Sequence, residues 1–299
     1  MRQTAILAGL CLWGVAAFAA DPALLNLVMP NAKVLAGVNV AATKNSPFGK
    51  FILGRIAANR RPSPGFFDPL TDATEYLLAI NADPSSPELL VFASGTFSPA
   101  RIAATAANRA DLEVRTYDGD TLIVTTNPQA KVVRAVAFIG VSIALTGDVT
   151  DVKAALDRST TVNSIDLALA AEVNTLSANN DVWVASLVGL PGRKMQALQA
   201  IQSFNGGLKF GANVTGNAQA VANSPQNAAA LVSVIQLMAT AAKNPVPQSV
   251  QVSAVDSAVN LSLTLSEAQA EAQVDALTNG LAALRRQARP SGQVPQSAR

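Results

Sequence analysis

The sequence predicts an α+β fold of two similar units, each an antiparallel sheet with helices packed on one face. Three observations lead to this prediction. Residues 208–265 read as strand, helix, strand, turn and strand. Residues 89–126 show a similar order of strand, helix and hairpin. Short segments of alternating apolar residues are separated by amphipathic segments of helical period, which is typical of sheets covered by helices.

The helix of the later segment has clear start and stop signals. Ser224-Pro225 predicts its start, because serine caps free backbone N–H groups and proline needs no donor at the first helical position. Pro245 and Pro247 predict its end. The apolar residues that recur between them are Leu231, Val234, Ile235, Met238, Ala241 and Ala242. The helix should therefore bury one stripe and expose the other.

A hairpin is predicted after this helix, with its turn near Asp256-Ser257. A tight turn there pairs Ala254 with Val259 and Val252 with Leu261. These apolar side chains then share one face of the sheet, and a slip of one residue would separate them. We expect the apolar stripe of the helix to cover that face.

The earlier segment repeats this order. Ser98-Pro99 predicts a helix after the strand 89–97, and 112–126 predicts a hairpin. Asp118-Gly119-Asp120 is expected as a three-residue loop, which would place Val114 opposite Val124 and Thr116 opposite Leu122. A third Ser-Pro step, at residues 46–47, follows the strand 33–40. The recurrence predicts an internal repeat, with a first unit at 20–160 and a second at 161–289.

The other elements follow from the same signals. Further helices are expected at 23–28, 47–56, 150–156, 166–176, 193–204 and 266–289, and further strands at 75–81, 132–146 and 181–188. Gly140 is expected to divide the second of these strands. Ser266 and Gln269 match a capping box at the start of the last helix. Residues 290–299 are polar and predicted to be disordered.

The first 19 residues predict a secretory signal peptide. Arg2 supplies the positive start, residues 6–16 a short apolar run, and Ala17-Phe18-Ala19 an A-x-A cleavage site, so cleavage is expected before Ala20. No later segment is long and apolar enough to span a bilayer, so we expect no transmembrane span after cleavage. The predicted signal peptide is of a bacterial type, so we expect a periplasmic or secreted protein.

The composition excludes several classes of chemistry. The chain of 299 residues has no histidine, and its one cysteine, Cys11, lies in the predicted signal peptide. Ser-His-Asp and Cys-His catalysis and histidine- or thiolate-bound metals are therefore excluded from the mature chain. The formal net charge of +2 is too small and too evenly spread to indicate nucleic acid as a partner. We predict no cofactor.

Several acidic and glycine motifs are possible sites. Asp118-Gly119-Asp120 lacks the further oxygen ligands of a calcium loop, and a hairpin turn explains both aspartates. Asp148 and Asp151 could act as an acid–base pair or bind a cation, but they also suit the N-terminal end of a helix. The glycines between 206 and 216 lack the lysine of a phosphate loop. We therefore predict no catalytic, cofactor-binding or metal-binding residue.

One loop is a candidate interaction site. Residues 60–69 combine loop-forming prolines with charged and aromatic side chains, and the candidates are Arg60, Arg61, Phe66 and Phe67. They could contact a partner or a membrane surface. In the simpler interpretation the two phenylalanines fold back onto the core.

Short motifs carry one resemblance. They are Met29-Pro30-Asn31-Ala32-Lys33, Ser46-Pro47-Phe48-Gly49-Lys50, Ala144-Leu145-Thr146-Gly147-Asp148 and Asn180-Asp181-Val182-Trp183. With them the chain resembles certain uncharacterised exported bacterial proteins. The resemblance implies export and an α+β build, and it supplies no catalytic residues.

Three functions remain open at this level. The leading hypothesis is a non-catalytic exported binding or interaction protein of unknown ligand. The second is a carboxylate-dependent hydrolase acting on envelope or extracellular glycans, which needs two acids about 5–10 Å apart in a pocket, one of them with a raised pKa. The third is an envelope assembly factor that uses the loop with Phe66 and Phe67.

Overall fold

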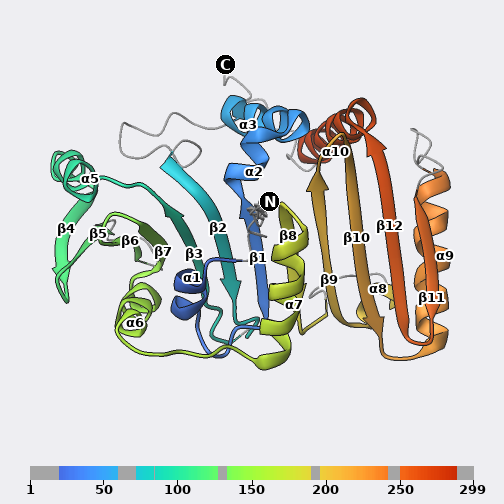
Figure 1. Cartoon of the computed structure of the whole chain (residues 1–299), viewed down its shortest axis with the longest axis horizontal. Coiled ribbons are helices and arrows are strands. Elements are labelled where there is room, and N and C mark those ends of the chain that lie inside the picture. Colours follow the sequence, from blue (N-terminus) through green and yellow to red (C-terminus); the bar gives the residue numbers. More distant parts are fainter. Residues whose placement is uncertain are drawn as a thin grey trace, which may run out of the picture.

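The computed structural model describes residues 20–59, 72–83, 85–126, 133–189, 196–241 and 250–287. In these ranges the chain forms one antiparallel sheet of twelve strands in the order β11-β12-β10-β9-β8-β1-β2-β3-β7-β6-β5-β4 (Figure 1). The strands are β1 Val34–Asn39, β2 Ala73–Ile80, β3 Leu89–Gly95, β4 Leu112–Tyr117, β5 Asp120–Thr125, β6 Arg134–Ile139, β7 Ile143–Asp148, β8 Val182–Ser186, β9 Ile201–Phe210, β10 Asn213–Ala222, β11 Gln251–Val255 and β12 Ala258–Ser266. The helices are α1 Pro22–Leu27, α2 Val40–Asn45, α3 Pro47–Asn59, α5 Pro99–Ala106, α6 Val149–Ser159, α7 Leu167–Asn179, α8 Gln196–Gln199, α9 Pro225–Ala241 and α10 Glu267–Gln287.

The α+β class is confirmed, but the sheet is continuous. Strand β1 pairs with β2 on one side and with β8 on the other, which joins the early and late parts of the chain. The sequence left open whether the two units share one sheet; they do, and helices cover both faces of it instead of the one face expected. The physical reason lies in β1 itself, where residues 34–38 are apolar on both faces, as suits a strand in the middle of a sheet covered on both sides. The boundary near residue 160 stays a prediction.

The first face of the sheet carries the largest core. Helices α1, α6 and α7 lie over it, in front of the sheet in Figure 1. Leu24, Val152 and Val173 are fully buried side chains of these three helices. They pack against alternate residues of the strands below, including Leu35, Leu77, Leu90, Phe92, Leu122 and Leu145. This cluster fixes the position of the N-terminal and middle strands.

The second face is covered in three separate places. Helix α5 packs near β5 and β6 through Ile102 and Ala106. Helices α3 and α10 pack together over one end of β9, β10 and β12, where Phe48 and Ala270 meet Leu265. Helices α8 and α9 cover the other end of the late strands through Leu198 and Leu231. These three groups of helices belong to separate apolar clusters, and no described helix covers the part of the face between them.

Three of the four predicted helix caps are present. The Gly49 N–H donates to the Ser46 hydroxyl oxygen at 2.9 Å, and the Asn227 N–H donates to that of Ser224 at 3.2 Å. At the start of α10 the Ser266 N–H donates to the side-chain oxygen of Gln269 at 2.9 Å, as a capping box requires. The Ser98 side chain makes no cap hydrogen bond. Polar side chains thus fix the direction of three of the helices that cover the second face.

The late hairpin has the predicted register. Ala254 lies opposite Val259 and Val252 opposite Leu261, with the turn at Asp256. The preceding part differs from the prediction. Residues 201–204 begin strand β9 instead of continuing a helix, and of the helix predicted at 193–204 the described residues contain α8, Gln196–Gln199. Strands β9 and β10 then pair over their whole length, and tertiary pairing overrides the helical spacing of Leu198 and Ile201.

The β4–β5 hairpin was predicted one residue out of register. Val114 lies opposite Ile123, and Thr116 lies opposite Thr121. The reason is the turn. Asp118 and Gly119 both have positive φ, of 50° and 90°, which makes a two-residue turn whose twist matches that of the strands.

Among the described helices, none combines the length and hydropathy that crossing a membrane requires.

Candidate functional site

The part of the second face that no described helix covers has a row of mostly small residues as its floor. Ala36, Val184, Gly206, Ala218 and Leu261 lie side by side on five neighbouring strands, each opposite the next. Three of these five positions have only a methyl group or no side chain. At Gly206 a Cβ would come within 2.9 Å of the Ala218 Cβ. The backbones of β9 and β10 therefore form a depression between larger neighbours.

Larger apolar side chains form the two walls. On the side of α3 and α10 the next row contains Val182, Leu208 and Leu263, which also contact the core cluster below these helices. On the side of α8 and α9 the wall contains Phe204 and Val259, together with Ile235 from α9. These two covers belong to separate apolar clusters, and the depression between them is a groove.

The groove has a cavity volume of about 540 Å³. Sites for small molecules in proteins are concave, mostly apolar and about 300–1,000 Å³ in volume. No charged side chain is among the described residues that line it. Of its polar lining residues, Asn205, Asn217 and Gln219 alternate onto the opposite face of the sheet. The arrangement can hold an apolar group, and it offers no acid or base to act on a substrate.

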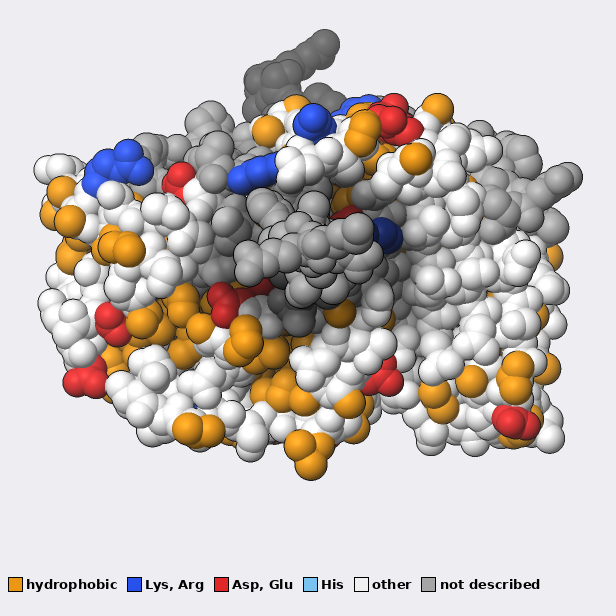
Figure 2. All heavy atoms as spheres, in the orientation of Figure 1, with side chains coloured by type: hydrophobic (Ala, Val, Ile, Leu, Met, Phe, Trp, Pro, Cys, Tyr) orange, Lys and Arg blue, Asp and Glu red, His pale blue; other side chains and the backbone are white. Residues whose placement is uncertain are grey.

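A smaller hollow lies on the first face, beside α7. Its volume is about 270 Å³, and amide and hydroxyl side chains line it, including Asn180, Asn205, Asn217, Gln251, Ser253 and Ser262. Over β9, β10 and β12 Figure 2 shows an area almost without hydrophobic or charged side chains. Gln219 donates to Asn260 at 2.9 Å, and Asn205 donates to Glu172 at 3.0 Å. These groups are partly paired with one another, as in a solvated sheet face.

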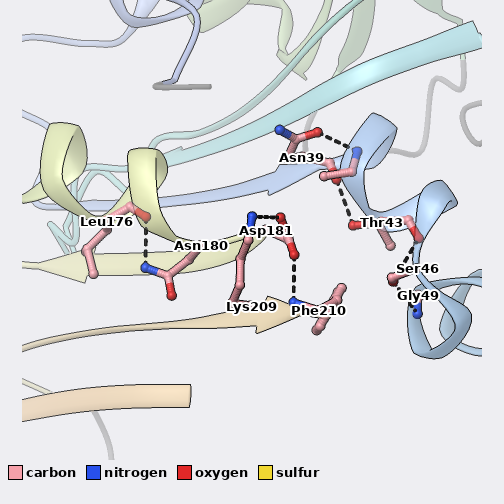
Figure 3. A network of polar contacts seen from close by, with 10 residues as sticks. Asn39, Thr43, Ser46, Gly49, Leu176, Asn180, Asp181, Lys209 and Phe210 are labelled. Atoms are coloured by element: carbon pink, nitrogen blue, oxygen red, sulfur yellow. Dashed lines mark hydrogen bonds and ion pairs between the residues drawn. The ribbon is translucent and has the colours of Figure 1, made fainter. Parts of the chain in front are cut away.

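A buried carboxylate ties the late strands to the central one (Figure 3). Asp181 is 2% exposed, and its carboxylate accepts from the Lys209 ammonium and from the Phe210 N–H, both at 2.7 Å. The Asp181 backbone carbonyl accepts from the Asn39 N–H at 2.7 Å. Asp181 therefore joins the ends of β1, β8 and β9 and helps to fix the strands that carry the groove.

Another carboxylate, that of Glu75, has an altered pKa. Burial raises the pKa of Glu75 to about 7, the hydrogen bond from the Asp21 N–H opposes the rise, and the Asp21 carboxylate adds to it. Glu75 is thus an acid with a raised pKa beside a second acid. Neither of the two hollows is lined by Glu75 or Asp21, and the Asp21 carboxylate accepts from the Ala23 N–H to cap α1. Neither of these two hollows therefore brings the pair to a substrate, as glycoside hydrolysis would need.

The sequence candidates are scattered. The loop with Arg60, Arg61, Phe66 and Phe67 lies outside the described residues, as does the tail after residue 289. Asp118 is in the β4–β5 turn, and the Asp148 carboxylate caps α6 by accepting from the Thr150 N–H at 2.9 Å. In the described ranges no three His, Cys, Asp or Glu side chains gather in a way that could hold a metal ion.

Sequence reasoning missed the groove. Its floor depends on register across five strands, and neither the pairing of β1 with the distant β8 nor the length of β9 was predicted. A signal was present in the sequence, because Gly206, Gly216 and Ala218 interrupt strands that are otherwise apolar on this face. Glycine inside a strand often marks a close approach of a ligand or another backbone.

Comparison with known proteins adds information on the fold. No family model matches the sequence, and no curated protein is similar to it. Two crystal structures of TP0453, its crystal forms IV and I, have a similar fold, with TM-scores of 0.56 and 0.55. The sequence identities are 14% and 13%, and the alignments cover 84% and 85% of this chain and 95% and 96% of TP0453. The chain therefore shares an overall fold with TP0453.

Proposed function

We propose that this protein is a non-catalytic exported binding protein, whose ligand places an unbranched apolar chain in the groove on the second face of the sheet. The observation that carries the proposal is the groove itself, about 540 Å³ in volume and lined by apolar side chains. Apolar surface that lies in water favours any partner that covers it, by about 25 cal/mol for each Å² removed from water. A partner without charge in its buried part suits this lining best.

The ligand class follows from the shape and chemistry of the lining. The floor runs across five strands as one row, which favours an extended chain over a compact ring system. Each buried CH₂ group contributes about 0.8 kcal/mol, so lengthening the chain by two carbons should tighten binding roughly 15-fold until the groove is full. A charged or polar head would remain outside, where water solvates it.

Export and the internal repeat belong to the same proposal. The A-x-A pattern at residues 17–19 supports cleavage before Ala20. An apolar-chain carrier suits the periplasm or the extracellular space, where such molecules must pass through water. The recurring order of strand, helix and hairpin supports two similar units, 20–160 and 161–289, within the single sheet.

The test is a binding titration with a matched pair of variants. Chains that begin at Ala20 are titrated with a fluorescent fatty acid and competed with unlabelled saturated fatty acids of eight to sixteen carbons. Ala218 is exposed and points into the groove, so Ala218→Leu should fill the floor and weaken binding at least about tenfold. Thr215→Ile is the control, because Thr215 is an exposed residue of the same strand on the opposite face. Equal affinity in both variants, or no dependence on chain length, would contradict the proposal.

A further inference from the structure

The first two described residues, Ala20 and Asp21, follow the predicted cleavage site directly and pack against the sheet. The Ala20 side chain is 3% exposed and belongs to the same core cluster as Leu24 and Leu77. The Asp21 N–H lies 3.2 Å from Oε2 and 3.4 Å from Oε1 of Glu75. Residues 20 and 21 are thus held against β2, immediately after the A-x-A pattern. A cleavage before Ala20 would place the new N-terminus beside Glu75.

The neighbours of Glu75 in the described part of the chain do not balance its charge. Its neighbours on the adjacent strands, Asn39 and Ser94, are neutral. The other acid beside it is Asp21, at the start of α1. From α2, the Lys44 ammonium donates to the Ala73 carbonyl at 3.2 Å, two residues earlier on β2. In the described part of the chain Glu75 forms no ion pair, and its pKa is raised to about 7.

Hydrolysis of the bond between Ala19 and Ala20 changes this balance. Water adds its hydroxyl to the Ala19 carbonyl carbon, and the Ala20 nitrogen leaves as an amine that takes up a proton at neutral pH. A free α-amino group ordinarily has a pKa of about 7.7–8.0. This ammonium would lie one residue from the N–H that already contacts Glu75, and an opposite charge within roughly 4–6 Å favours the ionised carboxylate.

We propose that removal of residues 1–19 creates an ammonium on Ala20 that pairs with Glu75 and fastens the start of α1 to β2, so that processing completes the fold. The inference rests on the proposed export. The proposed ion pair assigns a structural role to Glu75 that is independent of the groove. Glu75 and Leu77 alternate onto the first face of the sheet, and the groove lies on the second. The ion pair also makes the dependence of stability on pH differ between the two forms of the chain.

The direction in which stability changes with pH follows from the difference in the Glu75 pKa between the folded and unfolded chain. While Ala20 is joined to Ala19, Glu75 has a folded pKa above its ordinary value of 4.5. Its contribution to stability is then fully present below pH 4.5 and is lost as the pH rises through about 7. In the processed chain the ion pair lowers the Glu75 pKa, and this loss between pH 4.5 and 7 disappears. The pair weakens only when the pH rises above the pKa of the ammonium.

The test compares a chain that begins at Ala20 with one that carries an eight-residue Gly-Ser extension before Ala20. The ¹³C shift of the Glu75 carboxyl carbon is followed through a pH titration, and Glu75→Gln identifies the resonance. We expect a midpoint of about 7 in the extended chain and one at or below 4.5 in the chain that begins at Ala20. Equal midpoints in the two chains would overturn the proposal.

Two further measurements separate this inference from the proposed function. The thermal midpoint at pH 7.5 should be higher in the chain that begins at Ala20, and Glu75→Gln should remove the difference between the two chains. Fatty-acid affinity should be the same in both, because Glu75 and the groove lie on opposite faces. A mass of the native protein that places its first residue elsewhere than Ala20 would overturn the processing step and leave the groove titration unaffected.

Discussion

Asp181→Ala should lower the free energy of unfolding by about 3 kcal/mol. The substitution removes a carboxylate that is 2% exposed and leaves the Phe210 N–H and the Lys209 ammonium without their acceptor. The Phe210 N–H is buried, so water cannot replace its lost acceptor, whereas the Lys209 side chain is 53% exposed and water can replace part of the lost ionic contact. Urea denaturation of the chain from Ala20, followed by circular dichroism, measures the change.

Two variants calibrate this expectation. Asp181→Asn keeps an oxygen that can accept from the Phe210 N–H but loses the ionic attraction to Lys209, so its effect should be intermediate. Glu113→Ala removes an exposed acid paired with Arg115 on β4 and should leave the unfolding free energy unchanged. If Asp181→Ala were as mild as Glu113→Ala, Asp181 would not be what joins β1, β8 and β9.

Trp183→Ala should cost about 3–5 kcal/mol, the usual range for removing a buried tryptophan. The indole is 4% exposed and lies against the backbone of Gly37 on the neighbouring strand, where a Cβ would overlap the ring. Gly37→Val alone should therefore destabilise by about 1–3 kcal/mol through overpacking. In the double variant the valine occupies space that the indole has vacated.

This pair permits a double-mutant cycle. The two changes together should cost less than the sum of the single changes, by about 1–3 kcal/mol. Gly54→Ala is the control for replacing a glycine, because no atom lies within 4 Å of a Cβ built there. It lies within α3 and should be neutral or stabilising by up to about 1 kcal/mol. Additive costs for Gly37 and Trp183 would contradict the packing described here.

Local signals predicted the helix starts well. Ser46, Ser224 and Ser266 each cap the helix that the sequence assigns to them, because capping depends on residues within one turn. The late hairpin was also predicted with the correct register, since the alternation of residues 250–265 and one short turn suffice to specify it. Both depend on contacts between near neighbours in the chain.

Two other features were not predictable in this way, one of them local and the other dependent on distant parts of the chain. The two-residue turn at Asp118 required positive φ at both positions, and a one-residue difference in loop length moved the whole β4–β5 register. The pairing of β1 with β8 joins segments about 150 residues apart, so no local pattern indicates it. The groove depends on that pairing, and for this reason the sequence showed its small residues without showing their alignment.

The most direct measurement of the central claim is photocrosslinking with a fatty acid that carries a diazirine near the end of its chain. If the chain lies in the groove, labelled peptides should contain residues 204–208, 216–220 and 259–263, and Ile235 of α9 should also be labelled. An excess of unlabelled fatty acid should remove the label, and Ala218→Leu should reduce it. Saturable labelling confined to α1, α6 and α7 on the opposite face, or labelling that competitor does not reduce, would contradict it.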